Sequence, residues 1–483
     1  MIYNETKYNS HWDTKKLVEL GTFSRGKSKH RPRDDKRLYE GGGYPLIQTG
    51  EVKAANLYIT KHENEYGEFG LSQSKLWDTG TLCITIAANI AETALLAYPM
   101  CFPDSVVGFT AFPEKSSELF MHYVFTYIRN SIKNSVSGSI QDNINIEYLS
   151  QLDFKVPDKP SQDKIVNVLV SIDKKIEANN KMCAELETMC QTLYNYWFTQ
   201  FDFPNADGNP YRTSGGAMVW NAQIKRNIPK DWEAYPLSYI IANINTGLNP
   251  RDNFILGNGE IQYITVKNLT CEGTIDFNGC DTIDENARRI IHKRSDIQIG
   301  DILFASIAPL GRCYLIQNTP ENWDINESVF SIRANTDRIT PEYLYMYFMS
   351  EGFIKSATSS STGSIFKGIR ISTLSDMIAV VPPKHIAESF SGQIKSILEL
   401  KEQKNAENQE LIKLRDWLLP MLMNGQVTVA DPMPNAHILE FNNQKYEQYD
   451  VRQAARSFGE DSTDDTADLV KEFIKRRKND SKS

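Results

Sequence analysis

Apolar residues recur at alternating steps of three and four positions along residues 160–198. The stripe consists of Ile165, Leu169, Ile172, Ile176, Cys183, Leu186, Cys190, Leu193 and Trp197, with polar Asn179 at the remaining place. Such a heptad pattern predicts a helix that packs along its length against another helix. Pro160 suits the first turn, where a missing N–H costs no hydrogen bond. At a rise of about 1.5 Å per residue, this helix would be roughly 55 Å long.

The helix and the segment before it occur twice in the chain, with an offset of 225 positions. The matched positions include Gly138 with Gly363, Ile144 with Ile369, Leu149 with Leu374, Val156 with Val381, Leu186 with Leu411 and Leu193 with Leu418 and, with a slightly smaller offset, Trp12 with Trp232 and Gly80 with Gly300. A tandem duplication explains this self-similarity. We therefore expect the order globular domain, long helix, globular domain, long helix.

The second long helix, about residues 386–423, has a more polar stripe. Its apolar members include Ile394, Ile397, Leu411 and Leu418, and it is interrupted by Lys401, Lys404, Asn408 and Arg415. Pro420 is expected to end or kink the helix. Two equivalent helices can bury each other's stripes as an antiparallel pair, in which Asn179 and Asn408 would fix the register. The alternative is two ordinary amphipathic helices that pack on separate domains.

The predicted fold class is α+β, with two duplicated mixed α/β domains separated by two long helices that form an antiparallel coiled coil. Short apolar runs predict strands in both domains, at 44–48, 82–87, 94–98, 105–112, 261–266, 301–307, 312–317 and 328–334, and helices follow at 119–132 and 341–357. The expected bounds are 1–158 for the first domain, 159–200 for the first long helix, 201–384 for a connector plus the second domain, 385–425 for the second long helix and 426–483 for a partly disordered tail.

Composition narrows the class of protein. The chain of 483 residues has no run of 18 apolar residues, so no membrane span is expected, and its polar N-terminus does not resemble a signal peptide. Seven cysteines without a C-x-x-C pair favour a reducing cytoplasm over a disulfide scaffold. The net charge of −8 argues against indiscriminate nucleic-acid binding, although it allows a local basic face.

The most basic window lies at residues 22–37, where glycine, serine and proline predict a loop. Its candidate DNA contacts are Arg25, Lys27, Lys29, Arg31 and Arg33. Such side chains can neutralise phosphates, and arginine can also read guanine edges. A solvated surface loop explains the same residues equally well.

A polar turn precedes the last strand of each domain and adds further candidates. The first turn carries Ser139, Gln141 and Asn143, and the second carries Ser364, Lys367 and Arg370. Other basic candidates in the second domain are Arg251, Arg288 and Arg289. The turn recurs in both duplicated domains, but its side chains differ. This indicates that the two domains recognise different targets. The alternatives are a structural turn and independent drift of the loops after duplication.

No catalytic pattern was found in the chain. The sequence has no phosphate-binding loop, dinucleotide fingerprint, nucleophile elbow or H-E-x-x-H motif, and its seven histidines show no metal-ligand spacing. We therefore expect no catalytic residue, metal or cofactor in this chain.

The two helix-leading segments resemble the DNA-specificity subunits of type I restriction–modification systems. The resemblance is carried by NINIEYLSQLDFKVPDKPSQDKIVNVLVSIDKKIEANN and IRISTLSDMIAVVPPKHIAESFSGQIKSILELKEQKNAENQ, and the connector FDFPNADGNPY…SGG is similar to one common in that family. It implies two target-recognition domains that read the halves of a split site in double-stranded DNA, with a helix pair as spacer. It also implies docking of two methyltransferase (M) subunits and of restriction/translocase (R) subunits. S-adenosylmethionine and ATP with Mg²⁺ would then be bound by those partners.

Two other functions are alternatives to this one. A non-catalytic coiled-coil scaffold without a DNA role would fit the net acidity, although it leaves the duplicated domains unexplained. An enzyme without a recognisable motif has no support in the residues.

Overall fold

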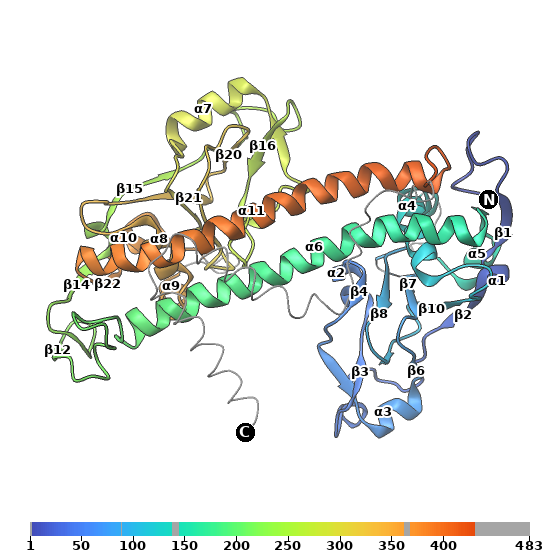
Figure 1. The fold of residues 1–483 in the computed structure, drawn as a ribbon, viewed down its shortest axis with the longest axis horizontal. Helices are drawn as coiled ribbons and strands as arrows, with labels where there is room; N and C mark the ends of the chain where they lie inside the picture. The colour runs from blue at the N-terminus through green and yellow to red at the C-terminus, as the bar shows by residue number, and fades with distance from the viewer. Residues whose placement is uncertain (1, 88, 138–143, 362–367, 430–483) are drawn as a thin grey trace, which may run out of the picture. The chain divides into compact units, whose positions relative to one another are not determined.

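The computed structural model describes residues 2–87, 89–137, 144–361 and 368–429, and Met1–Val427 form one compact unit. Two long helices, α6 (Lys159–Tyr194) and α11 (Lys384–Met423), lie side by side through the middle of this unit (Figure 1). Asn179 donates to Asn408 at 2.9 Å, with Asp173 beside Arg415 on one side of this contact and Glu187 beside Lys401 on the other. Residue numbers rise along one helix as they fall along the other. The antiparallel pairing predicted from the heptad stripe is therefore confirmed.

The ends of both helices follow from local sequence. The Asp158 carboxylate accepts a hydrogen bond from the Ser161 N–H, with Pro160 in the first turn, and a π-helical turn at Asn195–Thr199 continues α6. Of the two effects expected of Pro420, it does not end α11, because the helix runs on to Met423, where the predicted helix of about residues 386–423 also ends. Buried Leu422 and Met423 anchor this last turn.

The first domain is built on a five-stranded sheet in the order β2-β10-β7-β8-β4, beside smaller sheets β5-β3-β9-β6 and β1-β11. Its strands are β1 Asp13–Lys16, β2 Gly21–Arg25, β3 Tyr44–Leu46, β4 Tyr58–Ile59, β5 Asn64–Tyr66, β6 Leu76–Trp77, β7 Leu82–Thr85, β8 Thr93–Leu96, β9 Met100–Cys101, β10 Val106–Ala111 and β11 Asp153–Val156. Its helices are α1 Leu17–Leu20, α2 Thr49–Ala54, α3 Glu68–Gln73, α4 Glu118–Ser137 and α5 Ile146–Gln151.

The second domain repeats this plan after a connector hairpin, β12 (Met218–Asn221) with β13 (Arg226–Pro229). Its strands are β14 Glu233–Pro236, β15 Ile241–Thr246, β16 Ile261–Ile264, β17 Asp281–Ile283, β18 Ile302–Ala305, β19 Cys313–Leu315, β20 Trp323–Ile325, β21 Val329–Ala334 and β22 Ile378–Val381. Its helices are α7 Glu285–Ser295, α8 Pro341–Met349, α9 Glu351–Ser360 and α10 Ile371–Asp376. The helix predicted at 341–357 is in fact two helices, because extended Ser350 interrupts it and caps α9.

The duplication extends to strand register. Asp13 pairs with Val156 in β1-β11, and the matching residues Glu233 and Val381 pair in β14-β22. The main sheets agree as well, since β10 lies between β2 and β7 in the same way as β21 lies between β15 and β18. The predicted fold class, two duplicated mixed domains with two long helices, is thus confirmed.

Both domains are anchored on the helix pair. Helix α4 of the first domain contacts α6 and α11, and α8 of the second domain does the same near the opposite ends of the two helices. Around α8 the contact is aromatic, with Phe198 and Phe390 4.9 Å apart and Tyr343 4.7 Å from Phe198 between ring centroids. Each domain is therefore positioned by both long helices together.

The buried stripe on the long helices differs from the predicted one in its second half. The predicted residues Ile165, Leu169, Ile172, Ile176 and Ile394 are buried, whereas Leu186, Leu193, Ile397, Leu411 and Leu418 are half-buried. Beyond Cys183 the buried positions on α6 are Glu187, Cys190 and Tyr194. Glu187 can lie there because Lys401 of α11 neutralises it. The predicted tail from residue 426 lies outside the described residues from 430 onward.

Candidate DNA interface

Several loops leave the main sheet of the first domain from one end. Arg25 at the end of β2 is in register with Val107, and Thr85 at the end of β7 is in register with Val106 at the start of β10. Three segments therefore meet at this end of the sheet: the loop after β2, the loop between β7 and β8, and the segment before β10. The basic window found in the sequence is the first of these loops.

The basic loop is pressed against the sheet end and against α3. The Gly26 N–H donates to the Val106 carbonyl at 2.8 Å, and the Lys29 N–H donates to the carbonyl of Gln73 in α3 at 3.1 Å. A Cβ atom on Gly26 would lie 2.3 Å from the Phe102 carbonyl oxygen, so this close approach requires glycine. The backbone is thus fixed while the side chains of Arg25 and Lys29 are exposed.

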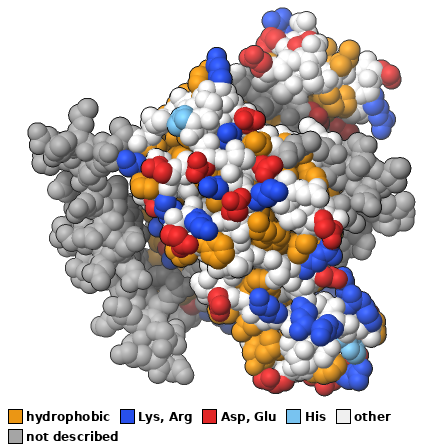
Figure 2. All heavy atoms as spheres, turned by 90° about the vertical axis from the view of Figure 1, so that its right-hand side faces the viewer, with side chains coloured by type: hydrophobic (Ala, Val, Ile, Leu, Met, Phe, Trp, Pro, Cys, Tyr) orange, Lys and Arg blue, Asp and Glu red, His pale blue; other side chains and the backbone are white. Residues whose placement is uncertain are grey.

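The cations of this loop divide into paired and open ones. Arg33 binds Asp104 at 2.7 Å, and Arg31 lies 3.9 Å from the same carboxylate. Arg25, Lys27 and Lys29 form no ion pair within 4 Å of an acidic residue that the structure describes. Lys and Arg side chains gather at the lower end of the molecule in Figure 2, at the height where Figure 1 shows α3 and β3. The open cations are therefore the ones available to phosphates.

The second domain presents an equivalent sheet end. Thr246 at the end of β15 is in register with Phe330, and Ala305 at the end of β18 is in register with Val329. The loop that follows β15 carries exposed Arg251. It also begins with a close approach, because a Cβ atom on Gly247 would lie 1.7 Å from the Ile325 carbonyl oxygen.

This loop packs on α7, the counterpart of α3. Leu248, Phe254 and Leu256 of the loop lie against a cluster that includes Ile291 of α7. Arg294 of α7 also donates to the Thr246 hydroxyl at 3.1 Å, so the start of the loop lies beside the end of this helix. This packing of the loop on α7 was not evident from the sequence, in which the two segments are far apart.

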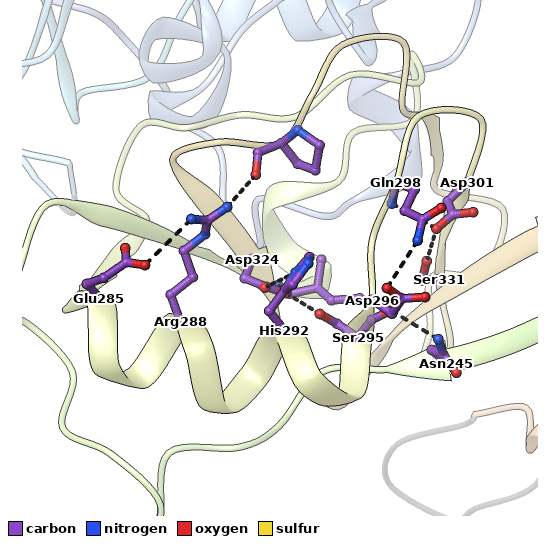
Figure 3. A network of polar contacts seen from close by, with 12 residues as sticks. Asn245, Glu285, Arg288, His292, Ser295, Asp296, Gln298, Asp301, Asp324 and Ser331 are labelled. Carbon is purple, nitrogen blue, oxygen red and sulfur yellow. Dashed lines mark hydrogen bonds and ion pairs between the residues drawn. The ribbon is translucent and has the colours of Figure 1, made fainter.

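Helix α7 is held in place by the buried carboxylate of Asp324 (Figure 3). The Ser295 hydroxyl donates to Asp324 at 2.7 Å, and Nδ1 of His292 lies 3.2 Å from its other oxygen. Burial raises the pKa of Asp324, and hydrogen bonds from Ser295 and from the Ile325 N–H offset part of that shift. Ser295 and His292 both face the carboxylate, so the group serves to orient the helix.

The two predicted arginines of α7 have different surroundings. Arg288 donates to the Pro320 carbonyl at 2.9 Å, as Figure 3 shows, and is half-buried. The side chain of Arg289 is 69% exposed and lies 3.6 Å from Glu285. Arg289 is thus the more available cation of the two.

The polar turns are described only at their flanks. Ser139, Gln141, Asn143, Ser364 and Lys367 lie outside the described residues. After the first turn, the Ile144 N–H donates to the Ile86 carbonyl at 3.1 Å, and after the second the Ile369 N–H donates to the Ser306 carbonyl at 2.8 Å. The flank of the first turn therefore meets the loop after β7, and the flank of the second turn meets the loop after β18. Arg370 is exposed beside the second turn.

Comparison with known proteins assigns this architecture. The model of the type I restriction modification DNA specificity domain matches residues 9–188 and 229–410, each match covering one domain and much of the long helix after it. The chain belongs to this family. Its duplicated domains are accordingly DNA specificity domains, and the role of the chain is DNA sequence specificity.

One relative of known name matches most of the chain, and a second matches about three fifths of it. The type I restriction enzyme MjaIX specificity subunit of Methanocaldococcus jannaschii is 22% identical over 435 residues, which are 87% of this chain and 94% of the relative. The HindI specificity subunit of Haemophilus influenzae is 23% identical over 340 residues, 59% of this chain and 71% of the relative. The crystal structure of the S subunit from M. genitalium has the same fold, with a TM-score of 0.52, 14% identity and coverage of 90% of this chain and all of that one.

The structure adds charged groups to the specificity domains that the sequence analysis missed. In the first domain, Glu92 beside the β7–β8 loop binds Arg129 at 3.0 Å and Lys133 at 2.8 Å, both from α4. The matching position of the second domain is Arg312, by the offset that relates Gly80 to Gly300. This change of sign was visible in the aligned repeats, although its place at the sheet end was not.

Two further findings concern the described residues, which are 2–87, 89–137, 144–361 and 368–429. Within these ranges no group of three or more His, Cys, Asp or Glu side chains is arranged to hold a metal ion. Among the same residues, no helix is both long enough and apolar enough to cross a membrane.

Proposed function

We propose that this chain is the sequence-reading subunit of a type I restriction–modification complex in the cytoplasm, in which each specificity domain reads one half of a bipartite DNA site. The helix pair would set the gap between the halves. A helix of 36 residues such as α6 is about 54 Å long, which exceeds the roughly 34–36 Å of one turn of B-DNA. The domains would thus contact separate patches of one duplex.

The observation that carries this proposal is the equivalence of the two sheet ends. In both domains a loop leaves the sheet, after β2 or after β15, and packs beside a helix, α3 or α7. In both, a glycine at the start of the loop lies too close to a carbonyl oxygen for a Cβ atom. Their chemistry differs, with Arg25, Lys27 and Lys29 open in the first domain and Arg251, Arg289 and Arg370 exposed in the second. Basic side chains fix position on phosphates, whereas contacts with base edges specify sequence. Equivalent surfaces with different side chains suit two different half-sites.

The chemistry of modification and cleavage is assigned to partners in this proposal. Two methyltransferase subunits would bind S-adenosylmethionine and methylate adenine, and restriction subunits would use ATP and Mg²⁺ for translocation and cleavage. The chain itself would contribute recognition and positioning. The names of its relatives as type I specificity subunits support this division of labour.

The experiment is a map of adenine methylation across the source genome, with the gene intact, deleted or replaced by variants. Deletion should abolish methylation at a two-part motif. The double variant Lys27→Ala/Lys29→Ala should weaken binding through one half-site, and Arg251→Ala/Arg289→Ala through the other. The matched control is Lys413→Ala, a 71% exposed lysine on α11 that lies on neither domain.

Two results would contradict the proposal. One is methyl transfer by the purified chain without a partner. The other is a methylation map that stays the same on deletion, combined with no sequence-specific DNA binding by the chain co-expressed with its methyltransferase partner. That pair of findings would favour the scaffold without a DNA role.

A further inference from the structure

The helix pair has an approximate twofold symmetry that follows from the duplication. Because α11 matches α6 with an offset of 225 positions, every contact between them has a counterpart in which the two helices exchange places. Asn408 donates to Asn180 at 2.8 Å, and the counterpart contact joins Cys183 to Asn405 at 3.4 Å. The centre of the pair thus obeys the symmetry.

The symmetry is broken by an ion pair beside the first domain. Arg415 binds Asp173 at 2.9 Å, and the Tyr123 hydroxyl donates to the same carboxylate at 2.5 Å. The counterparts of Arg415 and Asp173 are Cys190 and Leu398, which are buried together in an apolar cluster beside the second domain. A charged contact at one end therefore corresponds to an apolar contact at the other.

A second ion pair breaks the symmetry beside the second domain. Lys401 binds Glu187 at 2.5 Å, and the two side chains are only 6% and 11% exposed. Lys401 also donates to the Glu272 carbonyl at 2.5 Å. The counterparts of Lys401 and Glu187 are Ile176, which is buried, and Ile412, which is half-buried. Here too a charged pair replaces an apolar one.

Both acids lie on α6 and both bases lie on α11, which makes the helices non-equivalent as partners. If α6 packed on α6 of a second copy in the same geometry, Asp173 would face Cys190 and Glu187 would face Ile176. Two α11 helices would likewise place Lys401 against Ile412. A buried charge without its partner is strongly unfavourable, whereas an apolar pair carries no such penalty. Two α6 helices would therefore bury four carboxylates without a cation in each complex. Two α11 helices would bury two Lys401 side chains without a carboxylate, whereas Arg415, whose side chain is 27% exposed, would keep its ion pair with Asp416 at 3.0 Å.

We propose that these two ion pairs, whose carboxylates are both buried, make α6 and α11 selective for each other, so that each helix rejects a like helix from another copy of the chain. Partner choice in coiled coils is commonly set by such repulsive elements. The selectivity permits pairing within one chain or exchange of complementary helices between two chains. It does not depend on DNA recognition, so a failure of the proposed function would leave it standing.

The first test uses full-length chains with reversed charges. One variant carries Asp173→Arg and Glu187→Lys on α6, and the other carries Lys401→Glu and Arg415→Asp on α11. Each alone should melt well below wild type, and all four changes in one chain should restore most of the loss. Differently tagged variants, co-expressed, should also copurify as a two-chain complex, while two tagged wild-type chains should not. Wild-type melting of either reversed variant, or no recovery in the combined one, would overturn the proposal.

The second test measures rejection of like helices directly. A protease site inserted between Asp207 and Gly208, in an exposed turn of the connector, allows the folded chain to be cut into two halves held by the helix pair. Two differently tagged populations of the cut protein are mixed, and the urea concentration is raised until exchange is detected by native mass spectrometry. Exchange is seen as heterotypic complexes, in which an N-terminal half of one population is bound to a C-terminal half of the other. Complexes of two N-terminal halves should then be at least about a hundredfold rarer than heterotypic ones. Like and unlike complexes in statistical proportion would refute selectivity.

Two further variants sharpen this measurement. Replacing the four charged residues by their own counterparts (Asp173→Leu, Glu187→Ile, Lys401→Ile and Arg415→Cys) should raise the share of like complexes. The matched control removes the exposed pair Glu410 and Lys413 on α11 by Gln substitution and should leave the share unchanged. An equal increase in both variants would show that general destabilisation, rather than the buried pairs, governs partner choice.

Discussion

Lys401 offers the sharpest test of how the helix pair is stabilised. Its ammonium group is nearly buried and contacts the Glu187 carboxylate and the Glu272 carbonyl, both at 2.5 Å. The substitution Lys401→Met keeps an unbranched side chain that is one heavy atom shorter and removes the charge. Glu187 would then remain buried without a cation.

The expected cost can be worked from these contacts. Breaking a buried ion pair by removing one partner costs about 3–5 kcal/mol, and the orphaned Glu272 carbonyl adds about 1 kcal/mol. Met1–Val427 form one compact unit, for which the unfolding entropy is about 0.9 kcal/mol/K at typical values per residue. Each kcal/mol then lowers the melting temperature by about 1 °C. We expect Lys401→Met to melt about 4–6 °C below wild type.

The double variant Glu187→Ile/Lys401→Ile removes both charges, whereas a single variant leaves one buried charge without its partner. It installs the residue types found at the counterpart positions, Ile176 and Ile412. Because replacing both members of a buried pair by apolar residues is often neutral, the double variant should melt within about 2 °C of wild type. The assay is calorimetry at one scan rate of wild type, Glu187→Ile, Lys401→Ile and the double variant. A double variant that loses as much as the two single variants together would refute the reasoning.

Three further predictions concern the specificity domains. The variant Lys27→Ala/Lys29→Ala should reduce the slope of log affinity against log salt by about 1.8, since each phosphate contact contributes about 0.9, as measured by fluorescence anisotropy of the assembled complex. A slope equal to that of wild type would exclude these lysines from phosphate contact. Burial raises the pKa of Asp324, so this group's contribution to stability is present below its ordinary pKa near 3.8 and is lost as pH rises through the raised value. The melting temperature of Asp324→Asn relative to wild type should therefore increase between pH 3.5 and 7, and a constant difference would contradict the shift. Finally, Gly26→Ala should displace the basic loop, costing about 1–3 kcal/mol of stability and weakening DNA binding. Gly50→Ala, where a Cβ atom meets nothing within 4 Å, is its control and should not weaken either property.

The repeat was the strongest signal in the sequence. Its offset of 225 positions correctly relates β11 to β22 and the start of α6 to that of α11. The strand candidates fell where apolar runs met turns, and they recur in the structure with ends shifted by a few residues. These features are predictable because they depend on residues close together in the chain, whose periodicity and turn chemistry suffice.

The candidate interface was only partly predictable. Charge alone identified Arg25, Lys27 and Lys29, and the structure shows that these side chains form no ion pair among the described residues, whereas Arg33 is bound to Asp104. Nothing in the local sequence distinguishes Arg33 from its neighbours, because its partner is 71 positions away. The convergence of several loops on one sheet end also depends on strand order, which local patterns do not specify.

The polar positions of α11 show what a hydrophobic pattern leaves out. Taken singly, Lys401 and Arg415 interrupt the apolar stripe. Once the contact between Asn180 and Asn408 sets the register, antiparallel pairing assigns Glu187 to Lys401 and Asp173 to Arg415, because each pair has the same sum of residue numbers as the asparagines. Complementarity between the two helices is therefore encoded in the sequence as pairs rather than as single residues. The acids lie on α6, the bases lie on α11, and the counterpart positions on the other helix are apolar. These charges are therefore compensated only when α6 pairs with α11.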